Sequence, residues 1–246
     1  MNAAKANRRS NPFRKTGASA MNRNNVSNIA TCWEYIEAIA LEHESERIRQ
    51  AREEATSLGF EQSSAAQADF LALQARQINA HSAIVLGTGA VVETLAMLAA
   101  LDATGDGGQL TAVDSSTQGA DMIRRSHAAT SNGTSTKLRV VNAKSDVFLP
   151  RLNANDYDMI VVGGDVSNYD VAFDEAYRLL RPNGMLLITD AMATESSHGK
   201  GGLPDPSDRS DKALRLRQLI KNSEEEERFQ FSLVPIGTGL LIAIRQ

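Results

Sequence analysis

Short apolar runs alternate with longer helical patterns along most of the chain. Each run is rich in Val, Ile, Leu or Ala and is soon followed by Gly, Asn, Asp or Pro. Uninterrupted runs of this length are typical of strands that helices cover on both faces. Their alternation with helical segments predicts an α/β protein with a parallel, doubly wound sheet. The expected strands are 83–86, 109–113, 137–142, 157–162 and 185–189, and the helices between them are 91–101, 117–130, 146–152 and 169–180.

We expect two helices ahead of the first strand. Residues 32–58 are dense in good helix formers, and this helix is expected to break near Glu44. Ser63 or Ser64 can cap a second helix over 65–78, because a serine hydroxyl accepts hydrogen bonds from the free N–H groups of a first turn. Both helices are expected to cover the sheet or a subunit interface. The residues expected in the core are Trp33, Tyr35 and Ile36, and the apolar stripe of the second helix is Phe70, Leu73 and Ile78.

The pattern changes after the fifth strand. Residues 192–209 contain glycines and prolines that exclude a helix, and they follow a strand end, where open α/β sheets bind ligands. We therefore expect a lid over a second substrate. A helix over 212–221 precedes two β segments, 229–234 and 240–244, whose short PIGTG connection makes them antiparallel neighbours. The lid residues with side chains suited to substrate contact are His198, Lys200, Asp205 and Asp208.

Charge is unevenly distributed along the chain. Six basic residues and no acid precede Glu34, although the formal net charge of the whole chain is −4. The folded part is therefore acidic, which argues against a nucleic-acid-binding core. We expect residues 1–27 to be a disordered basic tail, because they hold few large apolar groups. The single domain is expected to comprise N-terminal helices over 28–80 and a nucleoside-binding core over 81–246.

Composition sets the broad class of protein. A length of 246 residues with 42% hydrophobic residues is sufficient for one α/β domain. No apolar run approaches the ~18 residues of a membrane span. Cys32 is the only cysteine, so no intrachain disulfide can form. We therefore expect a cytoplasmic protein that binds neither membranes nor nucleic acid.

Candidate chemistry is concentrated at the ends of the first two strands. The first strand runs into a Gly-Thr-Gly turn, and the second ends in an aspartate. Glycines let the backbone approach a ligand, a helix N-terminus presents free N–H groups, and a carboxylate can accept both ribose hydroxyls. The pattern favours a nucleoside cofactor, although a tight turn with a helix-capping aspartate would also explain it. The candidate cofactor residues are Gly87, Thr88, Gly89, Asp114 and Ser115.

The kind of nucleoside follows from what this turn lacks. The third glycine of the GxGxxG fingerprint, which packs a pyrophosphate-binding helix against its strand, is missing. S-adenosylmethionine has no pyrophosphate and does not require that glycine. The turn therefore favours S-adenosylmethionine over NAD.

Several segments have counterparts in one known family. VLGTG stands where that family has EIGTxxG, and DYDMIVVGGDVSNY stands where it has DFIFIDADKxNY. LLRPNGMLLITDA matches LLxxGGLIxxDN, and LVPIGTGLLIAIR matches a closing LPxGDGLxxxxK; TAVD and SDVFLPRL also have counterparts. Over roughly residues 45–246 the chain resembles the S-adenosylmethionine-dependent O-methyltransferases of the catechol and caffeoyl-coenzyme A type, in particular divergent actinobacterial members. The resemblance implies a Rossmann-like class I methyltransferase fold with a seven-stranded mixed sheet, an antiparallel last strand, a homodimer and a small hydroxylated acceptor.

The resemblance also implies a site, and this chain departs from it. Family members hold a divalent cation at positions that match Gly163, Asp190 and Ala191, so one oxygen ligand of three survives. Because a hard cation needs several oxygen donors, we expect no tightly bound divalent metal. The family's lysine matches Val166, whereas Asp165 retains the second acid of DADK. The resemblance leaves Asp165 and Asp190 as catalytic candidates, and implies cofactor contacts by Lys144, Ser145, Gly163, Gly164 and Asp165.

Three functions remain open on the sequence alone. The first is an O-methyltransferase that works without a bound cation, since positioning can accelerate an in-line displacement. The second is a catalytically silent homologue that binds the nucleoside or a protein partner; Val85, Val91 and Glu93, which replace a Glu, a Gly and a Ser of the family, fit such drift. The third is an NAD-dependent oxidoreductase, which the missing glycine and the terminal hairpin disfavour.

Overall fold

A mixed β-sheet forms the centre of the fold. The computed structural model describes residues 23–105, 107–128, 134–163, 165–193, 201–225 and 227–246. Its strands are β1 (Ser82–Leu86), β2 (Gln109–Asp114), β3 (Lys137–Asn142), β4 (Tyr157–Val162), β5 (Leu180–Thr189), β6 (Phe229–Val234) and β7 (Leu240–Arg245). In the described part of the chain they form one seven-stranded sheet of order β3-β2-β1-β4-β5-β7-β6. The first five are parallel, and β7 pairs antiparallel with both β5 and β6.

This topology confirms the predicted fold class, and the boundaries of β4 and β6 are as predicted. β5 differs, because the strand begins at Leu180 rather than at Met185. The Arg-Pro-Asn-Gly segment is an irregular part of the strand, and the register against β4 shifts between Tyr157 and Met159. Asn183 has a φ of 64°, which asparagine tolerates better than most residues.

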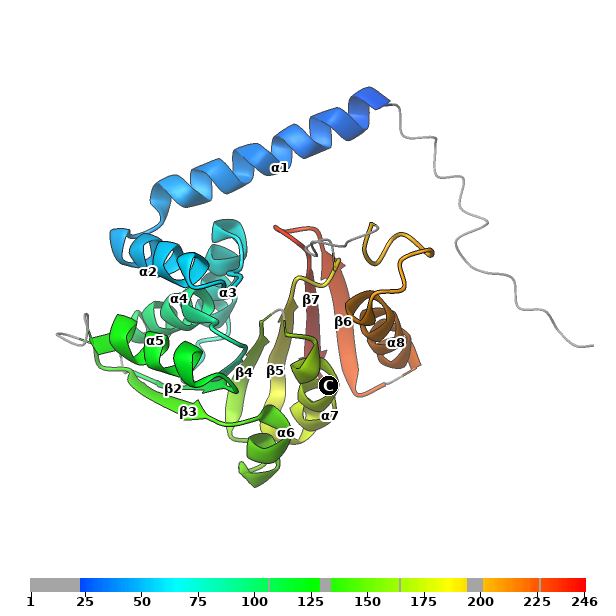
Figure 1. Cartoon of the computed structure of the whole chain (residues 1–246). Helices are drawn as coiled ribbons and strands as arrows, with labels where there is room; N and C mark the ends of the chain where they lie inside the picture. The colour runs from blue at the N-terminus through cyan, green and yellow to red at the C-terminus, as the bar shows by residue number, and fades with distance from the viewer. Residues whose placement is uncertain (1–22, 106, 129–133, 164, 194–200, 226) are drawn as a thin grey trace, which may run out of the picture.

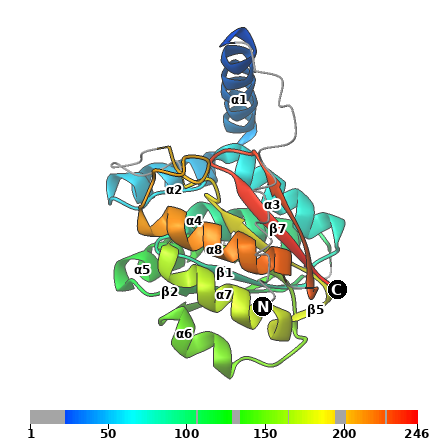
Figure 2. The ribbon, with the colours of Figure 1, turned by 90° about the vertical axis from the view of Figure 1, so that its right-hand side faces the viewer.

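Helices cover both faces of the sheet. Their bounds are α1 (Arg23–His43), α2 (Glu46–Ser57), α3 (Ala65–Gln77), α4 (Val91–Asp102), α5 (Thr117–Ala128), α6 (Ser145–Phe148), α7 (Tyr169–Leu179) and α8 (Asp211–Glu225), with 3-10 turns η2 (Leu149–Arg151) and η3 (Val166–Asn168). Alternate strand residues face opposite layers. In β1, Ile84 and Leu86 pack in the cluster that contains α7 and α8, whereas Ala83 and Val85 pack in the cluster of α3 and α4. Figure 2 shows α6, α7 and α8 together over one face.

The N-terminal helices differ from expectation at several residues. The predicted break occurs at Glu44, and Ser45 caps α2 while Ser64 forms a capping box with α3. α1 begins at Arg23, inside the expected disordered tail, because residues 23–31 contain no Gly or Pro to stop helix propagation. Residues 1–22 of that tail lie outside the described residues.

The expectation that α1 buries its aromatic residues is wrong. Trp33, Tyr35 and Ile36 are 50%, 67% and 51% exposed, and Leu73 of α3 is 60% exposed. The reason is visible in Figure 1, where α1 extends above the body of the molecule and meets it only near its C-terminal end. There Ala40 packs on the start of α3, and both carboxylate oxygens of Glu37 accept hydrogen bonds from the first N–H groups of α3. Among the described helices, none has the length and apolarity needed to span a bilayer.

Candidate functional site

A cavity of about 240 Å³ lies at the carboxyl ends of the central strands. It is bounded by the ends of β1, β4 and β5, by the segment between α2 and α3, and by the turn between β6 and β7. This is the edge at which parallel α/β sheets bind ligands. The residues that line it are Gly59, Phe60, Glu61, Gln62, Ser63, Gln67, Gly87, Thr88, Ala90, Glu93, Gly163, Asp165, Thr189, Asp190 and Thr238.

The glycine turn after β1 brings two strand ends close together. A Cβ atom at Gly87 would lie 2.8 Å from the Cβ of Ala90 and 3.5 Å from the Cα of Gly163. Gly89 has a φ of 66°, and a Cβ there would lie 2.4 Å from the ring of Phe60. Both glycines are therefore required by space, and Gly89 also by conformation.

The Asp114 carboxylate, at the end of β2, stabilises this turn. Its Oδ2 accepts a hydrogen bond from the backbone N–H of Gly89 and its Oδ1 accepts one from that of Ser116, both at 2.7 Å. The side chain is buried and fixes the approach of α5, where a Cβ at Gly119 would lie 2.2 Å from Oδ2. Burial raises the pKa of the Asp114 carboxyl, although the two hydrogen bonds oppose the rise. Asp114 thus supports the turn and is not itself among the residues that line the cavity.

Asp165 links the ends of β1 and β4. The hydroxyl of Thr88 donates a hydrogen bond of 2.7 Å to its Oδ2, while Ser167 donates to its Oδ1 through both N–H and hydroxyl. Burial acts to raise the pKa of Asp165, but these hydrogen bonds outweigh it, and the pKa lies below its ordinary value. A carboxylate with a lowered pKa binds protons weakly, which makes it a poor general base near neutral pH.

Asp190 follows β5 in a strained conformation. Its φ is 53°, and the next two N–H groups, of Ala191 and Met192, donate to the carbonyls of Gly239 and Thr238 in the β6–β7 turn. The carboxylate is buried, and its Oδ2 forms an ion pair with the ammonium of Lys212 in the first turn of α8. Backbone strain of this kind is concentrated at functional sites in proteins.

Lys212 was not among the residues singled out from the sequence. Its side chain is only 12% exposed. Burial lowers the pKa of the ammonium, although the nearby carboxylates of Glu61 and Asp165 oppose this. Nothing in the sequence marks Lys212, because it begins a helix after a long irregular segment that does not determine where the helix docks.

Two glutamines complete the cavity wall. The amide of Gln62 donates to the carbonyl of Gly89 at 2.8 Å, and its oxygen accepts from the N–H groups of Val91 and Val92 at the start of α4. Gln67 is fully buried, and its amide donates to the carbonyls of Ile236 and Gly239. These amides connect segments that are distant in sequence, so they also could not be identified from a local pattern.

Glu93 is a buried acid in the wall. It is 3% exposed, and its Oε2 has no hydrogen-bond partner among the described residues. Burial raises its pKa above the ordinary value of 4.5. Burial therefore shifts the equilibrium of this carboxyl towards its neutral form, in which it can donate a hydrogen bond.

The structure brings together some of the predicted site residues and separates others. Of the predicted residues that the structure describes, five line the cavity: Gly87, Thr88, Gly163, Asp165 and Asp190. Gly89 and Asp114 support the turn, as described above. Ser115 and Lys144 are exposed and do not line the cavity, whereas Ser145 is buried and donates to Asn168. Gly164 lies outside the described residues.

The lid segment is described only in part. His198 and Lys200 lie outside the described residues. Asp205 accepts a hydrogen bond from the N–H of Ser207, and Asp208 accepts from those of Gly202 and Ser210. These two carboxylates therefore stabilise the loop on which they lie.

Comparison with known proteins assigns the chain to a family. A protein-family model described as O-methyltransferase matches residues 38–246. The chain belongs to this O-methyltransferase family. A Mycobacterium tuberculosis protein curated under the name "Probable O-methyltransferase" is 29% identical over 195 residues, which are 79% of this chain and 83% of that protein.

Solved O-methyltransferases share the fold. The Bacillus cereus enzyme in complex with SAH has a TM-score of 0.71 at 16% identity, over 88% of this chain and 97% of that chain. TomG of Streptomyces achromogenes, which is involved in tomaymycin synthesis and was solved with SAM, has a TM-score of 0.71 at 18% identity, over 87% of this chain and 98% of that chain. Because the chain belongs to this family, the hypothesis that it is an NAD-dependent oxidoreductase has no support.

The residues present do not fit the divalent cation that the family resemblance implies. Gly163 and Ala191 carry no side-chain oxygen, and the Asp190 carboxylate already pairs with Lys212. Across the described ranges, no three His, Cys, Asp or Glu side chains come together as a possible metal site. An ammonium beside Asp190 would also repel a second cation.

Proposed function

We propose that this O-methyltransferase family member transfers a methyl group from S-adenosylmethionine to a hydroxyl oxygen of a small molecule, without a divalent cation. The observation that carries the proposal is the cavity at the ends of β1, β4 and β5, beside a glycine turn that Asp114 fixes. The O-methyltransferases solved with SAH and SAM support this cofactor, because their chains share the fold over nearly their whole length.

The cofactor is proposed to lie along the glycine turn. Asp114 is buried and does not line the cavity, so its part in this proposal is to fix the turn through its hydrogen bonds from the backbone N–H groups of Gly89 and Ser116. The Oε2 of Glu93, which has no hydrogen-bond partner in the described part of the chain, offers a further polar contact inside the cavity. The acceptor would then occupy the side formed by Thr189, Asp190 and Thr238, from which its oxygen faces the sulfonium.

Asp165 has a positioning role in this proposal. Its hydrogen bonds with Thr88 and Ser167 tie the glycine turn to η3, and its lowered pKa is unsuited to removing a proton from an acceptor. Asp190 is assigned the task of holding Lys212. Methyl transfer then depends mainly on alignment of oxygen, carbon and sulfur.

We also propose that the chain forms a homodimer through α1. An apolar groove lies between α1 and the β6–β7 turn, and it is lined in part by Trp33, Ile36, Leu41 and Ile236. Further large apolar residues on α1 are exposed, which is unusual for a helix that faces only water. A second copy of the same helix is complementary to such a surface by symmetry.

Calorimetric titration with S-adenosylhomocysteine tests the cofactor assignment, with NAD as the control nucleotide and with magnesium or a chelator added in parallel. We expect micromolar binding that neither magnesium nor the chelator changes, and no binding of NAD. Transfer of a labelled methyl group from S-adenosylmethionine to one member of a phenol and catechol panel would then establish the reaction. Absence of S-adenosylhomocysteine binding would refute the proposal and favour the catalytically silent homologue.

A further inference from the structure

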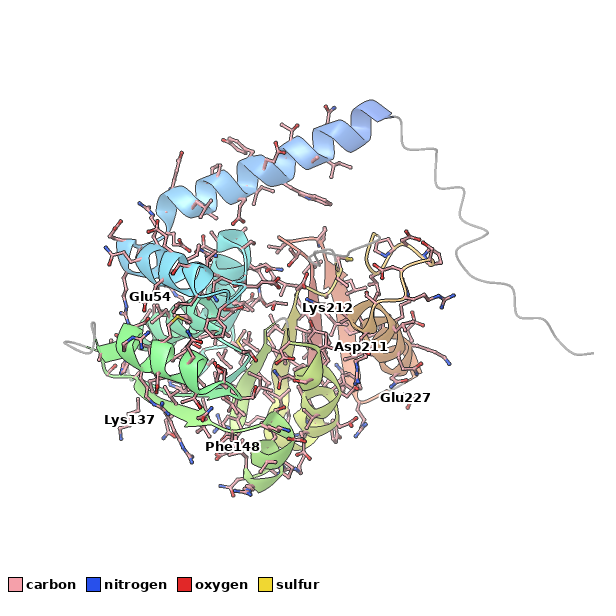
Figure 3. All side chains as sticks on the ribbon, in the orientation of Figure 1. Glu54, Lys137, Phe148, Asp211, Lys212 and Glu227 are labelled. Carbon is pink, nitrogen blue, oxygen red and sulfur yellow. The ribbon has the colours of Figure 1, made fainter. Side chains whose placement is uncertain are left out.

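A largely buried ammonium group lies against Asp190 at the acceptor side of the proposed site, although Lys212 is not itself among the residues that line the cavity. Lys212 reaches from the first turn of α8 to Asp190, whose carboxylate lines the cavity. Figure 3 shows Lys212 near the end of the sheet at which the chain leaves β5. Lysine is rarely this buried without a specific task, because removing an ammonium from water is unfavourable.

The fold holds this lysine in place. Arg217, one and a half turns further along α8, donates hydrogen bonds to the carbonyls of Gly202, Asp205 and Asp208. The loop before α8 is thereby fixed to the helix itself. The N–H of Ser210, close to the helix start, also donates a hydrogen bond to the Oδ1 of Asp208. Lys212 therefore extends from a rigid support, as a group that must meet a substrate requires.

The charges around the cavity explain why a cation is needed there. Glu61, Asp165 and Asp190 all line the cavity. The negative charges of Glu61 and Asp165 favour the protonated form of Lys212, and Asp190 forms an ion pair with it. An electron-rich acceptor oxygen would be repelled by these carboxylates alone. An ammonium has three N–H donors, and Asp190 is its only hydrogen-bonding or ion-pair partner among the described residues.

We infer that Lys212 binds the acceptor oxygen as an oxyanion and supplies the positive charge that a divalent cation supplies in metal-dependent relatives. This inference rests on the proposed methyl transfer and narrows its acceptor to acidic hydroxyls, of which phenols are the simplest class. The covalently attached cation also explains why the residues at 163 and 191 need carry no oxygen.

The reaction balances without any further reagent. The acceptor hydroxyl releases its proton to water as it binds beside Lys212, and the ammonium remains protonated throughout. A lone pair of the oxyanion then forms the bond to the methyl carbon, and the carbon–sulfur bond breaks with its electron pair moving to sulfur. The negative oxygen and the positive sulfonium are both neutralised, which gives a methyl ether and S-adenosylhomocysteine.

The first test compares Lys212→Met and Lys212→Arg, with Lys221→Met as a matched control on the exposed side of the same helix. We expect Lys212→Met to lower kcat/KM for the acceptor by about 100-fold, the usual effect of losing one preorganised electrostatic contact. Lys212→Arg should retain part of the activity, and Lys221→Met should retain all of it. The affinity for S-adenosylhomocysteine should change less than threefold in every variant. Equal kcat/KM in wild type and Lys212→Met would overturn the inference.

The second test does not depend on turnover. 4-Nitrophenol changes its visible absorption when it ionises, so its titration into protein saturated with S-adenosylhomocysteine reports the state of the bound phenol. We expect bound nitrophenolate at a pH where free nitrophenol is largely neutral, and we expect this shift to be lost in Lys212→Met. Identical spectra for the two proteins would refute the role of Lys212. A Lys212-dependent shift without methyl transfer to any acceptor would instead refute the proposed reaction and leave the oxyanion site standing.

A rescue experiment separates charge from packing. In a Cys32→Ser background, which removes the only native cysteine, Lys212→Cys can be alkylated with 2-bromoethylamine to restore an ammonium at nearly the original distance. Cys32 is exposed, so this background change is expected to be neutral. Alkylation should restore at least tenfold of the lost kcat/KM. No recovery in a folded, fully alkylated protein would contradict the inference.

Discussion

The Oδ2 atom of Asp114 accepts a hydrogen bond of 2.7 Å from the backbone N–H of Gly89, at the centre of the glycine turn. Through this bond the end of β2 sets the conformation of the loop that follows β1. The same carboxylate also accepts from Ser116, so one buried side chain organises the turn and the start of α5. The proposed cofactor site and the local stability therefore both depend on Asp114.

Replacement of Asp114 by Asn is expected to weaken both properties. The amide NH₂ would face one of the two N–H groups, which costs about 1–3 kcal/mol as an unsatisfied buried donor. The affinity for S-adenosylhomocysteine should fall by about 10- to 100-fold, as measured by calorimetry. Asp121→Asn is the control, because Asp121 forms an exposed pair with Arg124 on α5 and should change neither property. Wild-type affinity in Asp114→Asn would show that the cofactor does not lie along this turn.

Glu93 gives a prediction for the pH dependence of stability. Its folded-state pKa is raised by burial, so its contribution to stability is fully present below the unfolded value, about 4.5, and is lost as the pH rises through the folded value. Glu93→Gln removes this loss. The variant should match or fall below wild type near pH 4.5 and become the more stable protein as the pH increases towards 8. Urea unfolding at several pH values checks this, and parallel curves for the two proteins would contradict it.

Gln67 connects α3 to the β6–β7 turn. Gln67→Leu would remove one hydrogen bond from each of the carbonyls of Ile236 and Gly239, which would keep the bonds they accept from the N–H groups of Gly239 and Ala191. We expect a loss of about 1–3 kcal/mol in the free energy of unfolding. Gln77→Leu, at the exposed end of the same helix, should be neutral within about 0.5 kcal/mol. Chemical denaturation measures both. Equal destabilisation by the two changes would mean that helix propensity, rather than the bridge, is responsible.

The exposed apolar face of α1 predicts a change in oligomeric state. A Trp33→Glu, Ile36→Glu double variant places charge in the groove, and it should convert the proposed dimer into a monomer. Sedimentation analysis at several concentrations measures this. Because these side chains already face solvent in the single chain, the folded monomer should keep its helical content. A wild-type protein that is monomeric at high concentration would disprove the assignment.

The central strands could be predicted from the sequence because they are buried on both faces and therefore require continuous apolar runs, as in β1 and β4. The edge strand β6 alternates apolar with polar residues and is only partly buried, and it was predicted from its short connection to β7. The positions of Trp33 and Tyr35 could not be predicted in the same way. An apolar helical face indicates that something covers it, but not whether the cover belongs to the same chain.

The parts of the site that depend on local backbone structure could be predicted from the sequence. The parts that depend on how distant elements pack together could not. The Gly87 turn and the acid at Asp114 are marked by their place after two strands. The pairing of Lys212 with Asp190 depends on how α8 returns to the sheet after the lid segment. No local pattern encodes that return. The family resemblance indicated that metal ligands were lost at positions 163 and 191, but it did not indicate that a lysine lies beside Asp190.

The strand order has a consequence for synthesis on the ribosome. In the described sheet β7 lies between β5 and β6, and β6 pairs only with β7. β6 therefore has no strand to pair with until β7, which is later in the sequence, has been made. Thr238, between these strands, also completes the cavity wall. We therefore expect a nascent chain halted before residue 240 to expose an open sheet edge and to lack a competent pocket. Completion of the cavity wall would therefore wait for translation of the closing hairpin.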